Sequence, residues 1–247
     1  MSTKRHDAIL NLLFQYEEIF DGTLGTFHTK PVHLELKKNA VPKHHKAFPV
    51  AKIHEKTLKR ELDRLCKLGV VLRKNSNSTW AAPTFIIPKR NDTVRFISDF
   101  RYLNKCLVRK PYPIPKIADV LQKIEGLEWT TSMDLNMGYY IVHLDPYSQI
   151  LCSIVIPWGK YQYLGLPMGV NVSPDVFQGK MCNLIQDLEY VRTYLDDLLV
   201  ISNGSFEEHL YQLGVQIEYL GYLPTKDGIN QCKRKSKQYW IYSYQLL

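Results

Sequence analysis

The sequence predicts an α+β fold in which antiparallel sheets are backed by helices. Two β-prone runs surround an acid pair in VRTYLDDLLVI (191–201), and this pattern predicts a hairpin with the acids at its tip. A second alternating run, Trp129 to Leu135, predicts a half-buried strand that ends beside Asp134. Leucines three and four residues apart in 57–68 predict an amphipathic helix, which we expect to end at Gly69.

The remaining elements follow from the same periodicities. Residues 8–20 have apolar side chains at helical spacing, whereas 21–56 are rich in His, Lys, Pro and Gly and indicate a solvated basic linker with short extended pieces. Two apolar runs between Phe85 and Phe100 predict a hairpin with a basic tip. Further helices are predicted over 116–125, from Ser173 with Pro174 at the first helical position, and from Ser205 with the capping box Ser205–Glu208.

The charge of the chain indicates a polyanionic partner. Its 247 residues carry a formal net charge of +8, and 30–74 hold 13 Lys and Arg against 4 Asp and Glu. The five cysteines are widely spaced without a CxxC pair, which favours reduced thiols over disulfides or a zinc site. The sequence has neither a signal peptide nor a membrane-spanning run, so we expect an intracellular protein, in a cytoplasmic particle or the nucleus, without membrane contact.

The acid pair Asp196 and Asp197 indicates a cation site. Carboxylates beside a packed sheet are costly to desolvate and repel each other, and a divalent cation with oxygen ligands resolves both problems. Asp134 can face the same cleft if its strand neighbours the hairpin, because it lies on the polar face of that strand. The alternatives are a solvated Asp-Asp turn for the pair, and for Asp134 a turn cap with Asn136 and Gly138.

The tip of the hairpin within 85–100 gathers positive charge. Lys89 and Arg90 lie in the tip and Arg95 lies in the returning strand, so the three side chains form one cationic cluster. Such a cluster would hold the phosphates of a nucleoside triphosphate through charge-assisted hydrogen bonds. Plain solvation of a sheet edge explains the same residues equally well.

Four blocks resemble motifs of one family, in the order and at the spacing of that family. They are VRFISDFRYLN (94–104) with PYPIP (111–115), MDLNMGY (133–139), LPMG with NVSPDVFQ (166–178), and YLDD (194–197). On these blocks the chain resembles the reverse transcriptase of gypsy-type LTR retrotransposon polyproteins. The resemblance covers about 55–213 and, more loosely, 10–54, although helix capping by Ser173 and Pro174 would explain part of the third block equally well.

This resemblance implies a right-hand polymerase with fingers and a palm, whose ferredoxin-like antiparallel sheet is backed by helices. It also implies RNA-directed DNA synthesis on an RNA or DNA template with its primer and dNTPs. Two Mg²⁺ ions, with Mn²⁺ as a substitute, would lie about 4 Å apart between Asp134 and Asp196. Asp197 would support this pair, and the backbone carbonyl of Leu135 would add a ligand.

The resemblance also assigns a nucleotide pocket, and Leu135 is expected to belong to it as well as to the metal site. Lys89, Arg90 and Arg95 would hold the phosphates, whereas Tyr139 and Met168 would form the pocket for the sugar and base. In the family, the aromatic residue at the place of Tyr139 excludes a 2′-hydroxyl by sterics, so the expected product is DNA.

Three regions are expected: 1–54 as an N-terminal helix and basic linker, 55–213 as fingers and palm, and 214–247 as a partial primer-grip hairpin with an atypical basic and aromatic tail. After Leu213 the chain departs from the family pattern. We expect the helix from Ser205 to be cut short, 218–222 to form the primer-grip hairpin, and the thumb to be absent. The palm sheet would then lack an edge strand, and the domain would be marginally stable.

Two other interpretations remain open. One is a catalytically impaired retroelement relic that only binds nucleic acid through its basic surface, and the departure after Leu213 favours it. The other is an RRM-like RNA-binding module, which would have no need of three acids together. The sequence leaves the oligomeric state open.

Overall fold

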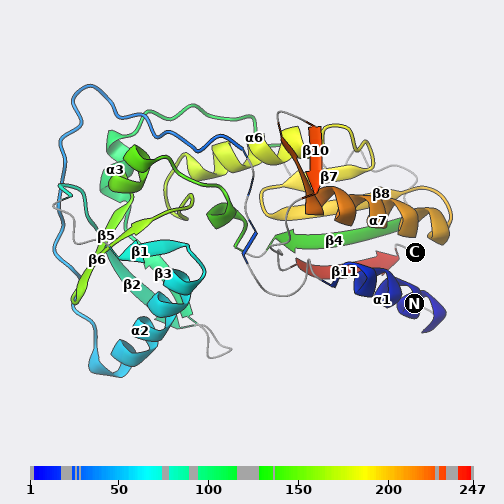
Figure 1. The fold of residues 1–247 in the computed structure, drawn as a ribbon, viewed down its shortest axis with the longest axis horizontal. Coiled ribbons are helices and arrows are strands. Elements are labelled where there is room, and N and C mark those ends of the chain that lie inside the picture. Colours follow the sequence, from blue (N-terminus) through cyan, green and yellow to red (C-terminus); the bar gives the residue numbers. More distant parts are fainter. Residues whose placement is uncertain are drawn as a thin grey trace. The chain divides into compact units, whose positions relative to one another are not determined.

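The computed structural model describes residues 3–17, 24, 25, 27, 29–73, 78–88, 94–115, 128–135, 137–225, 228–231 and 239–245. Helices and strands combine in an α+β fold, as predicted (Figure 1). The helices are α1 (Thr3–Gln15), α2 (Lys52–Lys67), α3 (Arg101–Cys106), the 3₁₀ helix η2 (Gly138–Ile141), α5 (Pro146–Leu151), α6 (Ser173–Ile185) and α7 (Phe206–Gly221). The strands are β1 (Val71–Arg73), β2 (Ala82–Pro88), β3 (Val94–Ser98), β4 (Trp129–Leu135), β5 (Ser153–Ile156), β6 (Gly159–Tyr163), β7 (Val191–Tyr194), β8 (Asp197–Ser202), β9 (Tyr222–Thr225), β10 (Gly228–Gln231) and β11 (Tyr239–Gln245).

Contacts divide the chain into two compact units, and the first contains the predicted palm sheet. This unit comprises Met1–Thr29, Tyr112–Gly138 and Pro174–Leu247. Its four-stranded sheet has the order β11-β4-β8-β7, and every neighbouring pair is antiparallel. The succession β4, α6, β7, β8, α7 and β11 is the β-α-β-β-α-β arrangement of a ferredoxin-like fold. Figure 1 shows α7 lying along β8 and β4, on which it packs.

A buried histidine ties α7 to this sheet. His209 is fully buried, and its ring nitrogens share hydrogen bonds with the hydroxyls of Thr131 on β4 (2.8 Å) and Ser202 on β8 (2.7 Å). Burial lowers the pKa of His209 to about 4, so the ring is neutral at pH 7. The histidine therefore joins the helix to two strands without placing a charge in the core.

The N-terminal helix belongs to the same unit. The helix predicted over 8–20 is observed as α1, which begins and ends about five residues earlier. Ile9 of α1 packs in an apolar cluster with Trp129 and Phe206, and the guanidinium carbon of Arg5 lies 4.7 Å from the Trp129 ring centroid. These contacts attach α1 to the base of β4 and the start of α7.

The second unit comprises Lys30–Pro111 and Tyr139–Ser173. Its five-stranded sheet has the order β1-β6-β5-β2-β3 and includes the predicted hairpin, in which β2 pairs with β3 in antiparallel fashion. β2 also pairs in parallel with β5, so this sheet is mixed rather than wholly antiparallel. The leucine stripe of α2, including Leu58 and Leu65, is buried as expected, and Gly69 follows the helix with a φ of +71°, where glycine is favoured.

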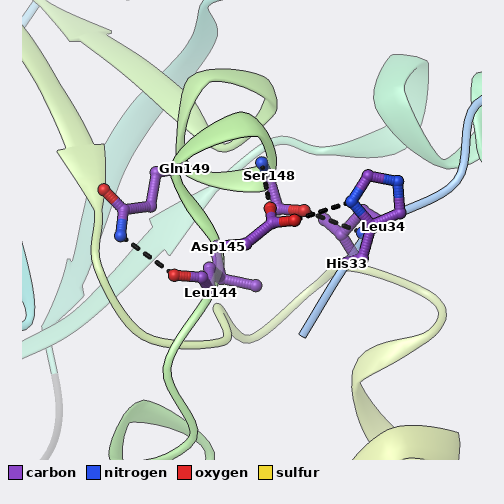
Figure 2. A network of polar contacts seen from close by, with 6 residues as sticks. All are labelled: His33, Leu34, Leu144, Asp145, Ser148 and Gln149. Carbon is purple, nitrogen blue, oxygen red and sulfur yellow. Dashed lines mark hydrogen bonds and ion pairs between the residues drawn. The ribbon is translucent and has the colours of Figure 1, made fainter. Parts of the chain in front are cut away.

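The segment after Lys30 is fastened to the second unit more firmly than a solvated linker would be. His33 Nδ1 lies 2.7 Å from Asp145 Oδ2, and the Leu34 N–H donates to the Ser148 hydroxyl at 2.7 Å (Figure 2). Asp145 also caps α5, because its Oδ1 accepts the Ser148 N–H at 2.7 Å. One network of hydrogen bonds thus holds both the extended segment and the start of a helix.

The structure corrects two expectations for the region after Leu213. α7 continues to Gly221 instead of ending near Leu213, so most of 218–222 is helical and does not form the expected hairpin; β9 and β10 pair with each other after the helix. β11 occupies the sheet edge that was expected to be vacant, with seven residues paired against β4 (Figure 1). The reason is that 239–245 is rich in Tyr, Trp and Ile, which favour strands, and so can supply the edge strand.

Other expectations are settled only in part. The helix predicted over 116–125 lies outside the described residues. The capping box is confirmed at its first bond, because the Glu208 N–H donates to the Ser205 hydroxyl at 3.1 Å. The four cysteines within the described ranges are free thiols. No described helix is long and apolar enough to cross a membrane.

Removal of 232–247 should destabilise the first unit, because β4 would lose one of its two partners and become an edge strand. We expect the free energy of unfolding in urea to fall by roughly 2–5 kcal/mol, given a small net contribution from each lost hydrogen bond. An exposed edge should also promote concentration-dependent association, measurable by light scattering. Removal of 246–247 alone, which spares β11, is the control, and equal unfolding midpoints for both truncations would contradict the prediction.

Candidate active site

The acid hairpin forms as predicted, with its tip shifted by one residue. β7 pairs with β8 so that Tyr194 faces Asp197, which leaves Leu195 and Asp196 as the two-residue turn. Asp197 is therefore the first residue of β8 and not part of the tip. Leu195 has a φ of +52°, and the first position of a two-residue hairpin turn with this backbone is one that favours glycine.

β4 brings a third acid to the same end of the sheet. Asp134 lies opposite Asp197 in the register of β4 and β8, and the Leu135 N–H donates to the Asp196 carbonyl at 2.9 Å. Along the end of β4, Ser132 and Asp134 are half-buried whereas their neighbours are buried, as the alternation predicts. The three acids are thus gathered within the first unit.

Burial and mutual repulsion disfavour the charged forms of two of these acids. Desolvation, together with the charges of Asp134 and Asp197, raises the pKa of Asp196 to about 7. Desolvation and the charge of Asp197 also raise the pKa of Asp134. Asp196 Oδ1 is buried and has no hydrogen-bond partner among the described residues. Without a cation, a substantial fraction of Asp196 therefore keeps its proton at neutral pH.

This chemistry fits a divalent metal ion. A hard cation prefers carboxylate and carbonyl oxygens, and it would satisfy the unpartnered Asp196 oxygen while removing the repulsion between the acids. No group of three or more His, Cys, Asp or Glu side chains converges as a ligand set in the parts of the chain that the structure describes. One or two carboxylates are nevertheless sufficient for Mg²⁺, because it usually takes its other ligands from water and substrate phosphates.

Two residues without a predicted catalytic role contact the acid turn. A Cβ on Gly138 would lie 3.2 Å from Asp196 Oδ1 and 3.0 Å from Phe177 Cζ, so a side chain there would crowd the carboxylate. Gln178 on α6 accepts a hydrogen bond from the Leu195 N–H at 2.7 Å. A glycine shortly after an acid-bearing strand is visible in the sequence, whereas nothing local connects Gln178 with a turn 17 residues away.

Apart from Leu135, which ends β4 next to Asp134, the predicted nucleotide-binding residues lie elsewhere in the chain. Lys89 and Arg90 are outside the described residues. Arg95 is exposed on β3, Tyr139 is buried on η2, and the Met168 side chain is 44% exposed; all three belong to the second unit. Their roles stay predictions.

Asn104 fixes the turn that follows Met168. Its side-chain amide donates to the Gly169 carbonyl at 2.9 Å, and its carbonyl oxygen accepts the Asn171 N–H at 2.9 Å. Gly169 has a φ of +91°, which a residue with a side chain rarely adopts. The last residue of the VRFISDFRYLN block therefore holds the LPMG turn, a connection within the second unit that sequence spacing does not reveal.

Comparisons with known proteins agree with these motifs. Residues 87–233 match the family described as reverse transcriptase (RNA-dependent DNA polymerase). The retrovirus-related Pol polyprotein from transposon 297 of Drosophila melanogaster is 27% identical in a 232-position alignment that covers 91% of this chain and 22% of that protein. The corresponding polyprotein from transposon gypsy of the same organism is 24% identical in a 226-position alignment that covers 79% of this chain and 22% of the relative. The chain thus spans about a fifth of the length of these relatives.

Solved structures match the fold. The foamy viral protease-reverse transcriptase in complex with RNA/DNA hybrid superposes with a TM-score of 0.79 at 19% identity, over 89% of this chain and 30% of that chain. The dRH form in complex with dsDNA also has a TM-score of 0.79, at 18% identity, over 94% of this chain and 45% of that chain. At such identities the agreement establishes the palm-like fold.

Asp196→Asn should stabilise the protein at pH 7 in the absence of divalent ions, by about 1–2 kcal/mol after allowance for solvent screening. The folded-state pKa of Asp196 is raised to about 7, so stability associated with its proton is present near pH 4 and is lost as the pH rises through 7. The advantage of the variant should therefore grow between pH 4 and 7. The measurement is urea unfolding of both proteins at several pH values. The titration of His209 affects both proteins equally and so does not contribute to the difference between their stabilities. An advantage that is constant with pH would contradict the assignment.

Proposed function

The chain belongs to the reverse transcriptase family, and on this premise we propose that it catalyses RNA- and DNA-templated DNA synthesis with 55–213 as its fingers and palm. The observation that carries the proposal is the Asp196 carboxylate, which is partly buried beside Asp134 with one oxygen that lacks a partner among the described residues. A purely structural sheet gains nothing from such a group, whereas raised carboxyl pKa values of this kind are common in catalytic sites.

Asp134 and Asp196 would hold two divalent ions, Mg²⁺ or Mn²⁺ in its place, with the Leu135 carbonyl as a further ligand. Reverse transcriptases generally use divalent metal ions, which supports this assignment. When bound, such ions lower the pKa of an attacking hydroxyl and neutralise charge on a triphosphate. Asp197, exposed and opposite Asp134, adds negative charge that strengthens cation binding.

Residues of the second unit would bind the nucleotide. Lys89, Arg90 and Arg95 supply the positive charge that triphosphate oxygens require, and the exposure of Arg95 leaves it accessible to an anion. Tyr139 would exclude the 2′-hydroxyl of a ribonucleotide. Met168 would contact the base, and its exposure on a turn that hydrogen bonds hold in place supports this role.

The proposed partners are an RNA or DNA template with its primer and dNTPs. Two kinds of support are available. The similar foamy viral structures are complexes with dsDNA or an RNA/DNA hybrid. The excess of Lys and Arg in 30–74, most of it exposed, suits a phosphate backbone.

Asp134→Asn and Asp196→Asn should each reduce primer extension by about 10⁴-fold or more, because each removes a charge that the metal ions require. The measurement is dNTP incorporation on a homopolymer template with its primer, with and without Mg²⁺. Asp63→Asn, which makes the same charge change at an exposed site on α2, is the matched control and should keep the unmodified rate. Extension by either acid variant at the control rate would refute the metal assignment, and salt-sensitive binding without any extension by the unmodified chain would favour a nucleic-acid-binding relic.

Tyr139→Ala should weaken the discrimination against ribonucleotides by roughly 10- to 100-fold, because removal of the ring opens space beside the sugar. The ratio of dNTP to rNTP incorporation measures the effect. Tyr139→Phe keeps the ring and should keep the discrimination. If the alanine variant remains folded and its ratio is unchanged, Tyr139 is a packing residue only.

A further inference from the structure

The turn that carries Asp196 has an unfavourable backbone at its first residue. Leu195 adopts a φ of +52°, in the left-handed region, where a branched side chain is disfavoured and glycine is preferred. Such a conformation persists only where neighbouring groups hold it. The groups that hold Leu195 therefore decide where the next residue, Asp196, places its carboxylate.

The shortest hydrogen bond to this turn is made by Gln178. Its side-chain carbonyl oxygen accepts the Leu195 N–H at 2.7 Å, and its amide nitrogen donates to the Thr193 carbonyl at 3.3 Å. The same nitrogen lies 3.3 Å from the Cys182 sulfur. Gln178 is fully buried on α6, so water does not compete for these hydrogen bonds.

Two further hydrogen bonds hold the same turn. The Thr193 hydroxyl donates to the Leu195 carbonyl at 3.4 Å, and the Leu135 N–H donates to the Asp196 carbonyl at 2.9 Å. Both backbone polar groups of Leu195 are thus engaged, and the turn is fastened to α6, β7 and β4 at once.

We propose that Gln178 is a positioning residue, whose amide holds Leu195 in the left-handed conformation and thereby keeps the Asp196 carboxylate beside Asp134. Two like charges that approach each other would otherwise push the turn open. If Leu195 relaxed to the right-handed region, the Asp196 side chain would point in another direction, since a change in φ at one residue reorients the residue after it. The inference rests on the proposed function, in which these acids bind metal ions.

Gln178→Met tests this role, because it keeps the length of the side chain but removes both the carbonyl oxygen and the NH₂ of the amide. Mn²⁺ binding, followed by electron paramagnetic resonance without nucleic acid, should weaken by roughly 10- to 100-fold, the usual effect of removing a residue that orients a metal ligand. Gln162→Met removes an amide that is also buried, in the second unit, and should leave Mn²⁺ binding unchanged.

The double variant Gln178→Met with Leu195→Gly separates positioning from general support. Glycine accepts a positive φ without strain, so this change should restore most of the Mn²⁺ affinity that Gln178→Met loses. A purely structural role of Gln178 would give no such recovery. Undiminished affinity in Gln178→Met, or a lack of recovery in the double variant, would overturn the proposal.

Hydrogen exchange at the Leu195 amide tests the hydrogen bond to Gln178 independently of metal binding. The amide should exchange slowly in the unmodified protein and rapidly in a folded Gln178→Met variant. Fast exchange in the unmodified protein would overturn the proposal even if Gln178→Met does not fold. If the unmodified protein binds no Mn²⁺, the proposed function fails, while the exchange rates still decide whether Gln178 holds the turn.

Discussion

Repulsion among three carboxylates is the constraint that the contacts around this end of the sheet must offset. Asp134 and Asp197 face each other across β4 and β8, although like charges at directly opposed positions destabilise an antiparallel pair. Asp196 adds a third acid, and burial of its carboxylate raises its pKa to about 7. β4 pairs with a strand on each side, β8 and β11, and these hydrogen bonds hold its backbone in place against the repulsion.

Hydrogen bonds hold the local backbone against this repulsion, and the energy of each is similar to the strain energy of the turn. A left-handed conformation at a non-glycine residue such as Leu195 costs roughly 1–2 kcal/mol. Each hydrogen bond from Gln178 and Thr193 contributes about 0.5–1.5 kcal/mol net. Together these hydrogen bonds outweigh the strain, so the turn keeps its left-handed residue without a ligand, and a cation that neutralises the acids would stabilise it further. Gly138 assists by leaving room beside the Asp196 carboxylate.

The parts of the fold that the sequence predicts are those encoded by local periodicity. Alternation in 129–135 and 191–201 identifies the strands and places Asp134 on the less buried face, and the leucine spacing in 57–68 identifies α2. Register, tertiary contacts and strand partners depend on distant residues, and no local pattern reports them. The one-residue shift of the hairpin tip, the contact from Gln178 to Leu195 and the pairing of β11 with β4 belong to this second class.

α7 illustrates how tertiary contacts decide what local patterns leave open. His209, Leu213 and Gln216 are buried at helical spacing, and this shared face explains why the helix runs past Leu213. His209 satisfies both ring nitrogens, whereas Gln216 is equally buried and neither of its amide atoms has a partner among the described residues. An unpaired buried amide costs roughly 1–3 kcal/mol, and burial of one leucine such as Leu213 contributes about as much in return. The helix therefore persists because its apolar contacts with the sheet outweigh one unsatisfied amide, and Gln216 is a local mismatch between this sequence and the fold that it adopts.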